Sequence, residues 1–196
     1  MKNKKLPKTP RGYLSWSQLS LWERDESLYR RIYLDGLKQS ENQYLKVGKA
    51  LATRLETGVE TDDELIEFIF MFLPKYEKNE YEINADFKGI PVLGKLDGFN
   101  RRGLIVGEYK TGRHWSQTMA DKSGQLTFYS ALVWLKYHRL PQEIRLHWAK
   151  TEYNQDGDLQ INGQIKTFIT HRTLSDIILL RGRIKKAWEN IIKMCN

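Results

Sequence analysis

The chain has 196 residues, of which 40% are hydrophobic and 12% aromatic, so it is long enough to form one domain with a buried core. Its longest fully apolar run, FIFMFL at 68–73, is far shorter than the roughly 20 residues of a membrane-spanning helix, and its first residues lack the apolar segment of a secretory signal. The short apolar runs therefore indicate no membrane. The single cysteine, Cys195, excludes an internal disulfide and a cysteine-ligated cluster, which favours a reducing, cytoplasmic location.

The charge balance favours a polyanionic partner, nucleic acid first. There are 32 Lys and Arg residues against 24 Asp and Glu, a formal charge of +8. Many basic proteins bind no nucleic acid, so charge alone leaves this open. Residues 1–12 are basic, contain proline and lack periodicity, and we expect them to form a flexible arm. Residues 13–196 are expected to form a single domain.

Helical periodicity dominates the first part of this domain. Apolar residues recur at helical spacing over 17–34, which predicts one helix there. A second helix is predicted over 44–57, with Gly58 as its end. A third is predicted over 62–73 and ends before Pro74.

The pattern then changes to the period of two that is typical of strands. Residues 80–87 alternate and are followed by Gly89 at a turn, and a hairpin of 90–99 and 103–110 comes next. A polar loop, a helix over 123–138, strands at 143–153 and 164–171, and a last amphipathic helix capped by Thr173 complete the chain. This order predicts an α/β or α+β fold with one central mixed sheet flanked by helices.

The hairpin LGKLDGFNRRGLIVGEYKTG (93–112) carries polar residues in core-like strands. Glu108 and Lys110 are two residues apart and share a face, and Asp97 on the neighbouring strand is within cross-strand reach. Two carboxylates brought together need a cation, and oxygen ligands favour Mg²⁺ or Mn²⁺. A nearby lysine suits metal-assisted hydrolysis of a phosphodiester. The alternative is an ordinary strand face, with each carboxylate paired to a lysine.

These residues resemble a known family. GKLDGF and GEYKTG resemble motifs II and III of the PD-(D/E)XK nucleases, most closely those of the RecB-like branch, which includes recombination nucleases and CRISPR adaptation exonucleases. LSWSQLSLWERDESLYRRIY resembles the N-terminal helix of that branch, VGKALATRLE its Gly-x-x-x-His helix, and GQLTFYSAL its Gln-x-x-x-Tyr helix. The matches run in the family order from about residue 14 to 135.

The resemblance implies a restriction-endonuclease-like core and a role for each matching residue. Asp97 and Glu108 would be metal ligands and Lys110 the catalytic lysine; the carbonyl of Tyr109 would be a further ligand, and Gln125 and Tyr129 would position the substrate. Tyr129 is equally explained as a core residue, because apolar residues surround it in the sequence.

The match breaks at two places. Ala52 stands at the position of the family histidine and cannot bind a metal. Glu56 lies four residues on, on the same helix face, and could supply an oxygen ligand, although it could equally be a solvated carboxylate. Arg24 and Asp25 stand where some members place a cysteine of an iron–sulfur cluster, so no cluster is expected.

Contacts to the DNA backbone should come from cations and hydroxyl groups near the site. Lys95, Thr111, Arg113 and Lys122 are the first candidates, and the basic arm and Arg181, Arg183, Lys185 and Lys186 of the last helix are the second. Each of the latter two could be only a solvated face. Trp115, in a polar loop, is the best candidate for stacking on an unpaired base, whereas Trp22 is expected in the core.

We therefore expect a Mg²⁺- or Mn²⁺-dependent deoxyribonuclease that is exonuclease-like and acts in recombination, repair or phage DNA processing. The chain has no Walker-type loop, so any helicase-type or recombination partner would be a separate protein. One alternative is a nuclease fold kept as a DNA- or partner-binding module, its metal site weakened at Ala52. Another is an unrelated basic protein, in which Asp97, Glu108 and Gln125 lie far apart. The oligomeric state stays open.

Overall fold

The computed structural model describes residues 9–38 and 42–195, and residues 1–8 of the predicted arm lie outside this description. Its centre is a five-stranded mixed sheet in the order β1-β2-β3-β4-β5. The strands are β1 (Lys78–Asp86), β2 (Pro91–Asn100), β3 (Ile105–Gly112), β4 (Ile144–Tyr153) and β5 (Leu159–Thr170). Only β3 and β4 pair in parallel, and the other neighbours are antiparallel. The predicted α+β class with a central mixed sheet is confirmed.

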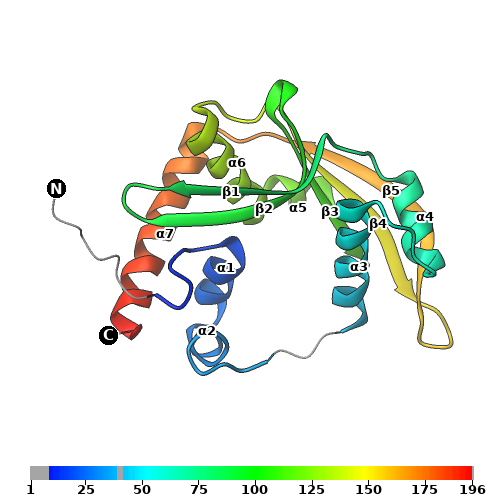
Figure 1. The fold of residues 1–196 in the computed structure, drawn as a ribbon, viewed down its shortest axis with the longest axis horizontal. Coiled ribbons are helices and arrows are strands. Elements are labelled where there is room, and N and C mark those ends of the chain that lie inside the picture. Colours follow the sequence, from blue (N-terminus) through cyan, green and yellow to red (C-terminus); the bar gives the residue numbers. More distant parts are fainter. Residues whose placement is uncertain (1–8, 39–41, 196) are drawn as a thin grey trace.

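Helices cover both faces of the sheet (Figure 1). The larger core joins the sheet to α1 (Trp16–Arg24), α2 (Glu26–Tyr33), α6 (Gly124–Tyr137) and α7 (Leu174–Cys195). A smaller core joins it to α3 (Gln43–Thr57) and α4 (Glu64–Phe72). The short α5 (Gln117–Asp121), within the predicted polar loop, precedes α6. In the described part of the chain, every helix is too short or too polar to cross a membrane.

The prediction of a single helix over 17–34 is wrong, because the helix is interrupted at Asp25, which separates α1 from α2. This residue is extended, with φ −158° and ψ 93°, and its N–H still donates to the carbonyl of Leu21 at the end of α1. Its side chain accepts a 2.9 Å hydrogen bond from the N–H of Leu28 and so caps α2. Aspartate favours such caps over helix interiors. The apolar stripe continues across the break, which is why periodicity alone does not reveal it.

A tight turn sets the register of β1 and β2. Lys88 and Gly89 both have positive φ, 59° and 85°, as a type I′ hairpin turn requires. The N–H of Phe87 donates to the carbonyl of Ile90 at 2.8 Å and closes the turn. The turn predicted at Gly89 is therefore confirmed, and the register that it sets extends to the far end of β1.

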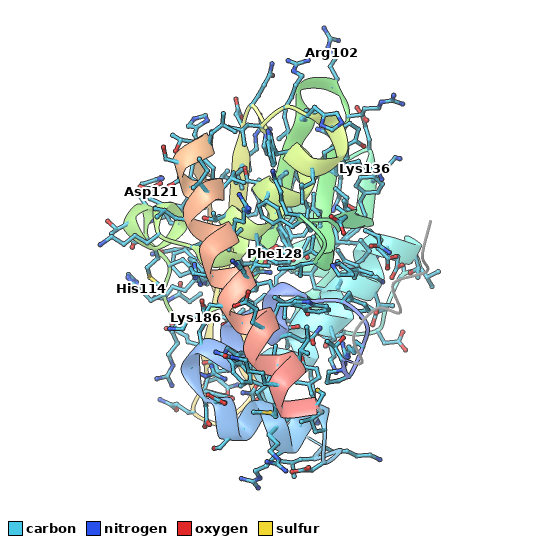
Figure 2. The ribbon with its side chains drawn as sticks, turned by 90° about the vertical axis from the view of Figure 1, so that its left-hand side faces the viewer. Arg102, His114, Asp121, Phe128, Lys136 and Lys186 are labelled. Atoms are coloured by element: carbon cyan, nitrogen blue, oxygen red, sulfur yellow. The ribbon has the colours of Figure 1, made fainter. Side chains whose placement is uncertain are left out.

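The hairpin of β2 and β3 opens into a fork. The two strands pair only through Gly98–Asn100 of β2 and Ile105–Gly107 of β3. Beyond Gly107, β3 continues beside β4 as far as Gly112. At the closed end of the hairpin, Arg102 projects into solvent from the connecting turn (Figure 2).

Two glycines at this fork make room for Tyr76. A Cβ on Gly98 would lie 2.3 Å from the Tyr76 ring, and a Cβ on Gly107 would lie 2.4 Å from it. The Tyr76 hydroxyl and Nε2 of the buried His147 form a 2.7 Å hydrogen bond. The chain entering β1 is thereby packed directly onto β2, β3 and β4.

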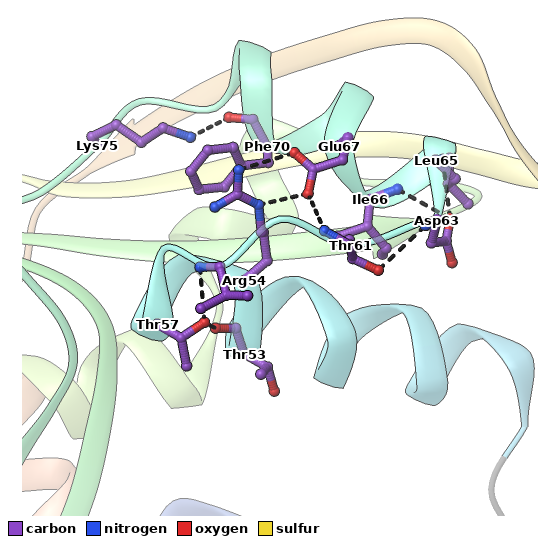
Figure 3. Close-up of polar contacts among 11 residues, drawn as sticks. Thr53, Arg54, Thr57, Thr61, Asp63, Leu65, Ile66, Glu67, Phe70 and Lys75 are labelled. Atoms are coloured by element: carbon purple, nitrogen blue, oxygen red, sulfur yellow. Dashed lines mark hydrogen bonds and ion pairs between the residues drawn. The ribbon is translucent and has the colours of Figure 1, made fainter.

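A half-buried ion pair fastens α4 to α3 (Figure 3). Nε and Nη2 of Arg54 donate to the two carboxylate oxygens of Glu67 at 2.6 and 3.0 Å. The guanidinium also lies 3.8 Å from the centre of the Phe70 ring, and Glu67 accepts a 2.9 Å bond from the N–H of Thr61. The Arg54 hydrogen bonds lower the pKa of Glu67. This bidentate pair fixes α3, which forms one wall of the cleft described next.

Candidate active site

A cleft of about 330 Å³ lies at the fork, between the sheet, α3 and the start of α6. Its lining includes three acidic residues, two lysines and one glutamine. The residues are Glu80, Asp97, Glu108, Tyr109, Lys110, Thr111 and Gln125, with Tyr44, Leu45, Gly48, Lys49, Leu51, Ala52 and Leu55 from α3.

Asp97 and Glu108 are the first residues beyond the paired part of the hairpin. Continuing the β2–β3 register by one residue places them opposite each other. Oδ2 of Asp97 accepts a 2.9 Å hydrogen bond from the N–H of Tyr109. Burial, and then the charge of Glu108, raise the pKa of Asp97 well above its usual range, and Lys110 opposes this shift. Two carboxylates are therefore held together at an electrostatic cost.

Glu108 offers a carboxylate oxygen of the kind expected at a cation site. Its side chain is 1% exposed, Oε1 pairs with the ammonium of Lys110, and Oε2 has no hydrogen-bond partner. An unpartnered buried carboxylate oxygen is costly unless a cation compensates it. Carboxylate oxygens are the ligands that Mg²⁺ and Mn²⁺ prefer, so Asp97 and Glu108 fit such an ion.

Lys110 stays charged in this cleft. Burial disfavours its ammonium, but the charges of Glu108 and Asp97 outweigh burial and raise its pKa. Its Nζ also donates a 3.0 Å hydrogen bond to Oε1 of Gln125. The lysine is thus fixed between the carboxylate of Glu108 and the amide of Gln125.

Tyr129 supports Gln125 from below the cleft. Nε2 of Gln125 donates a 2.9 Å bond to the Tyr129 hydroxyl. Tyr129 is 6% exposed, and burial, followed by the charges of Glu108 and Asp97, raises its pKa, so it remains neutral. The hydrogen bond joins Tyr129 to Gln125, but Gln125 lines the cleft whereas Tyr129 lies outside its lining. Tyr129 is part of α6 and is buried in the larger core, and its effect on the cleft passes through Gln125.

The start of α6 is held in place from two sides. The buried Arg172 donates to Oγ1 of Thr127 at 2.8 Å and to the carbonyls of Ala120 and Ser123 at 2.9 and 3.2 Å. On the other side, a Cβ on Gly124 would lie 2.3 Å from the Trp16 ring, so α1 packs tightly there. These contacts fix the turn that carries Gln125.

Other predicted residues lie at the rim or outside the cleft. Ala52 lines the cleft, whereas Glu56 is exposed and outside its lining. Lys95 and Arg113 are exposed, and Nζ of Lys95 lies 3.9 Å from Oε2 of Glu80. Trp115 is half-buried against the larger core.

Two further expectations concern residues away from the cleft lining. Trp22 lies in the core as predicted, 8% exposed. Lys122 is exposed in the short segment between α5 and α6.

Glu80 is the cleft residue that the sequence analysis missed. It is half-buried in β1 with a left-handed φ of 48°. Burial raises its pKa, Lys95 opposes this, and the charges of Glu56 and Glu108 raise it further. In the alternating pattern Glu80 is one charged residue among several. The two-residue turn at Lys88 and Gly89 sets the register of β1 and β2, and this register places Glu80 opposite Asp97.

The side chains of the described residues do not by themselves complete a metal site. Across residues 9–38 and 42–195, no three His, Cys, Asp or Glu side chains stand close enough together to hold an ion. Asp97 and Glu108 therefore form a partial donor set, to which backbone, solvent or a repositioned side chain would have to add.

Two solved exonuclease structures have the same architecture. A candidate exonuclease from Eubacterium rectale superposes with a TM-score of 0.62 at 11% identity, covering 98% of this chain and 86% of that one. A phage-related exonuclease from Haemophilus somnus superposes with a TM-score of 0.57 at 14% identity, covering 88% and 81%. The chain shares their fold. No family model and no curated protein matches the sequence.

The geometry also decides one alternative. An unrelated basic protein was expected to hold Asp97, Glu108 and Gln125 far apart. The three residues line one cleft, and Lys110 contacts both Glu108 and Gln125, so that expectation is wrong.

Proposed function

We propose that this protein is a Mg²⁺- or Mn²⁺-dependent nuclease that hydrolyses phosphodiester bonds in DNA, in an exonuclease-like manner, during recombination, repair or phage DNA processing. The observation that carries the proposal is the pair Asp97 and Glu108 at the fork, with a buried, unpartnered oxygen of Glu108 beside the ammonium of Lys110. Two proteins of the same fold are named as exonucleases, which supports the same chemistry.

Each cleft residue has a role in this proposal. Asp97, Glu108 and the carbonyl of Tyr109 would hold the divalent ion, which when bound polarises the phosphate and lowers the pKa of a water molecule. Lys110 offers positive charge to the phosphate oxygens and orients the attacking water. Gln125 keeps the Lys110 ammonium in the cleft through its 3.0 Å hydrogen bond.

Cations and one hydroxyl group around the cleft would hold the DNA backbone. Lys49 and Thr111 line the cleft, and Lys95 and Arg113 are exposed near it in sequence. Phosphate contacts release counterions, so we expect binding to weaken steeply as salt rises. These residues would contact phosphates rather than base edges, so we expect the protein to show little preference for DNA sequence.

One observation favours a second function. Ala52 lines the cleft at the family histidine position and offers no ligand atom. A site with too few ligands would bind DNA without cutting it, so the second candidate is a DNA-binding module on a nuclease fold.

Cleavage of labelled linear, circular and single-stranded DNA, with Mg²⁺, Mn²⁺ or EDTA, separates the two functions. We expect metal-dependent cutting that Lys110→Met abolishes and that Lys136→Met leaves intact, because Lys136 is exposed at the far end of α6 (Figure 2). Resistance of the circular substrate would establish an exonuclease. If the wild type and both variants bind DNA in a salt-sensitive way but none of them cuts it, the result would instead support the binding module.

A further inference from the structure

We infer that Glu80 is the third carboxylate of the cation site, supplied by β1 in place of the helix ligand that Ala52 cannot provide. This inference rests on the proposed function. It concerns how this chain completes a partial donor set.

Strand register carries the inference. The pairs Asn79↔Gly98 and Tyr81↔Leu96 lie on either side of Glu80 and Asp97. These two residues therefore lie opposite each other at a point where the pairing of β1 with β2 is interrupted, and Glu80 has a φ of 48° there. The register of β2 and β3, continued by one residue, places Asp97 opposite Glu108. Three neighbouring strands thus each contribute one carboxylate to the lining of the cleft. In the described residues the three side chains do not yet stand close enough together to hold an ion, so the Glu80 side chain would turn toward the other two when the ion binds.

The neighbours of Glu80 show how its position is fixed. The side chain of Asn79 donates a 2.8 Å bond to the carbonyl of Leu55 in α3. The Tyr81 ring stacks on Phe99, 4.9 Å between centroids, in the core shared with α6. Glu80 therefore lies between one residue tied to α3 and another packed against the opposite core.

The unpartnered carboxylate oxygen of Glu108 is a separate observation that points to an ion. Its Oε2 is buried without a hydrogen-bond partner although the residue lines the cleft. When ionised, the three carboxylates carry three negative charges. Two lysines lie against them: Lys110 pairs with Glu108, and Lys95 lies near Glu80. The side chain of Lys95 is 50% exposed and its Nζ is 3.9 Å from Oε2 of Glu80, so this contact is weak and easily replaced.

Glu56 is the rival for the same role, and its position is less suitable. It is exposed on α3 and lies outside the cleft lining, whereas Ala52 one turn earlier lines it. A carboxylate already in the cleft loses less freedom on binding an ion than one that must turn in from solvent. Glu80 is therefore the better replacement for the missing helix ligand.

The test is calorimetric titration of the full-length protein with Mn²⁺, which needs no DNA and no turnover. We expect Glu80→Gln to weaken Mn²⁺ binding about 10-fold or more, and Glu56→Gln to change it less. Glu82→Gln is the matched control, since Glu82 lies on the same strand and is exposed. Thermal unfolding of each metal-free variant verifies that it is folded.

A second variant keeps the test decisive if Glu80→Gln folds poorly. Lys95→Met removes the cation beside Glu80 and is expected to tighten Mn²⁺ binding, whereas a Glu80→Gln/Lys95→Met double variant should lose most of that gain. An equal gain in both backgrounds would show that Glu80 is not involved.

The outcomes separate this inference from the proposed function. If Asp97→Asn abolishes Mn²⁺ binding while Glu80→Gln binds like the wild type, the inference is wrong and the nuclease proposal stands. It is also wrong if Glu56→Gln has the larger effect. If the wild type binds no Mn²⁺ and cuts no DNA in its presence, the proposed function fails and the inference fails with it.

Discussion

The backbone N–H of Tyr109 donates a 2.9 Å hydrogen bond to the side chain of Asp97, just where the backbone pairing of β2 and β3 ends. A side chain thus takes the place of the next backbone contact across the fork. The carboxylate of Asp97 is held beside that of Glu108 by the main chain itself. This arrangement fixes two carboxylates side by side in the lining of the cleft, and several testable consequences come from it.

Asp97→Asn should stabilise the metal-free protein. The folded-state pKa of Asp97 is raised, so stability is highest below its unfolded pKa and falls as pH rises through the folded value. Asparagine carries no charge and so removes this loss of stability, while its side-chain oxygen can still accept the hydrogen bond from the N–H of Tyr109. At neutral pH we expect a melting temperature a few degrees higher, at about 2–4 °C per kcal/mol.

Calorimetry in EDTA and in Mn²⁺ checks this prediction. Mn²⁺ should stabilise the wild type and leave Asp97→Asn unaffected. A variant that melts below the wild type in EDTA would show that the two carboxylates are not in conflict.

Gln125→Met should reduce DNA cleavage by roughly 10–100-fold, the usual effect of losing a residue that orients a site. It frees the ammonium of Lys110 from the 3.0 Å bond but removes no proposed metal ligand. Mn²⁺ affinity should therefore stay within about twofold of the wild type. Steady-state cleavage and Mn²⁺ titration measure the two effects, and a parallel loss of both would refute a role limited to orientation.

Gly98→Ala and Gly107→Ala should each destabilise the fold by about 1–3 kcal/mol, because overpacking a core costs that much. The new methyl groups would meet the Tyr76 ring at 2.3 and 2.4 Å. Gly182→Ala is the matched control: it lies within α7 with no atom near the new methyl group, so it should be neutral or stabilising. Urea unfolding measures all three, and equal stabilities would show that Tyr76 moves aside freely.

His147 predicts how stability depends on pH. Burial, and then the charge of Arg145, lower its pKa from 6.5 to about 4. Its contribution is therefore fully present above the unfolded pKa and is lost as pH falls from about 6.5 to about 4, a total of about 3 kcal/mol. Unfolding free energies between pH 4 and 8 should show this loss in the wild type and in His114→Gln, whose histidine is exposed, and not in His147→Gln.

The hairpin was predictable because strand alternation and turn residues are local signals. Those signals placed Glu108 and Lys110 on one face and Asp97 within reach, and the structure brings the three together. The turn at Gly89 also follows from sequence. Because it is a two-residue turn, it fixes the register that brings Glu80 opposite Asp97.

Other features could not be predicted from the sequence pattern. The break at Asp25 is hidden because the apolar stripe spans both helices, and only the capping bond to Leu28 reveals it. The start of β5 at Leu159, earlier than predicted, reflects pairing with the end of β4. At the fork, Tyr76 packs over Gly98 and Gly107, a contact with no local sequence signal.

The most direct test of the account is the rate at which the wild type and Glu108→Gln degrade end-labelled linear duplex DNA as Mn²⁺ is increased. Glu108 supplies the buried, unpartnered oxygen on which the metal site depends. We predict a saturable, Mn²⁺-dependent rate for the wild type and no detectable rate for the variant. Cleavage that persists in EDTA, or in folded Glu108→Gln at the wild-type rate, would contradict the account.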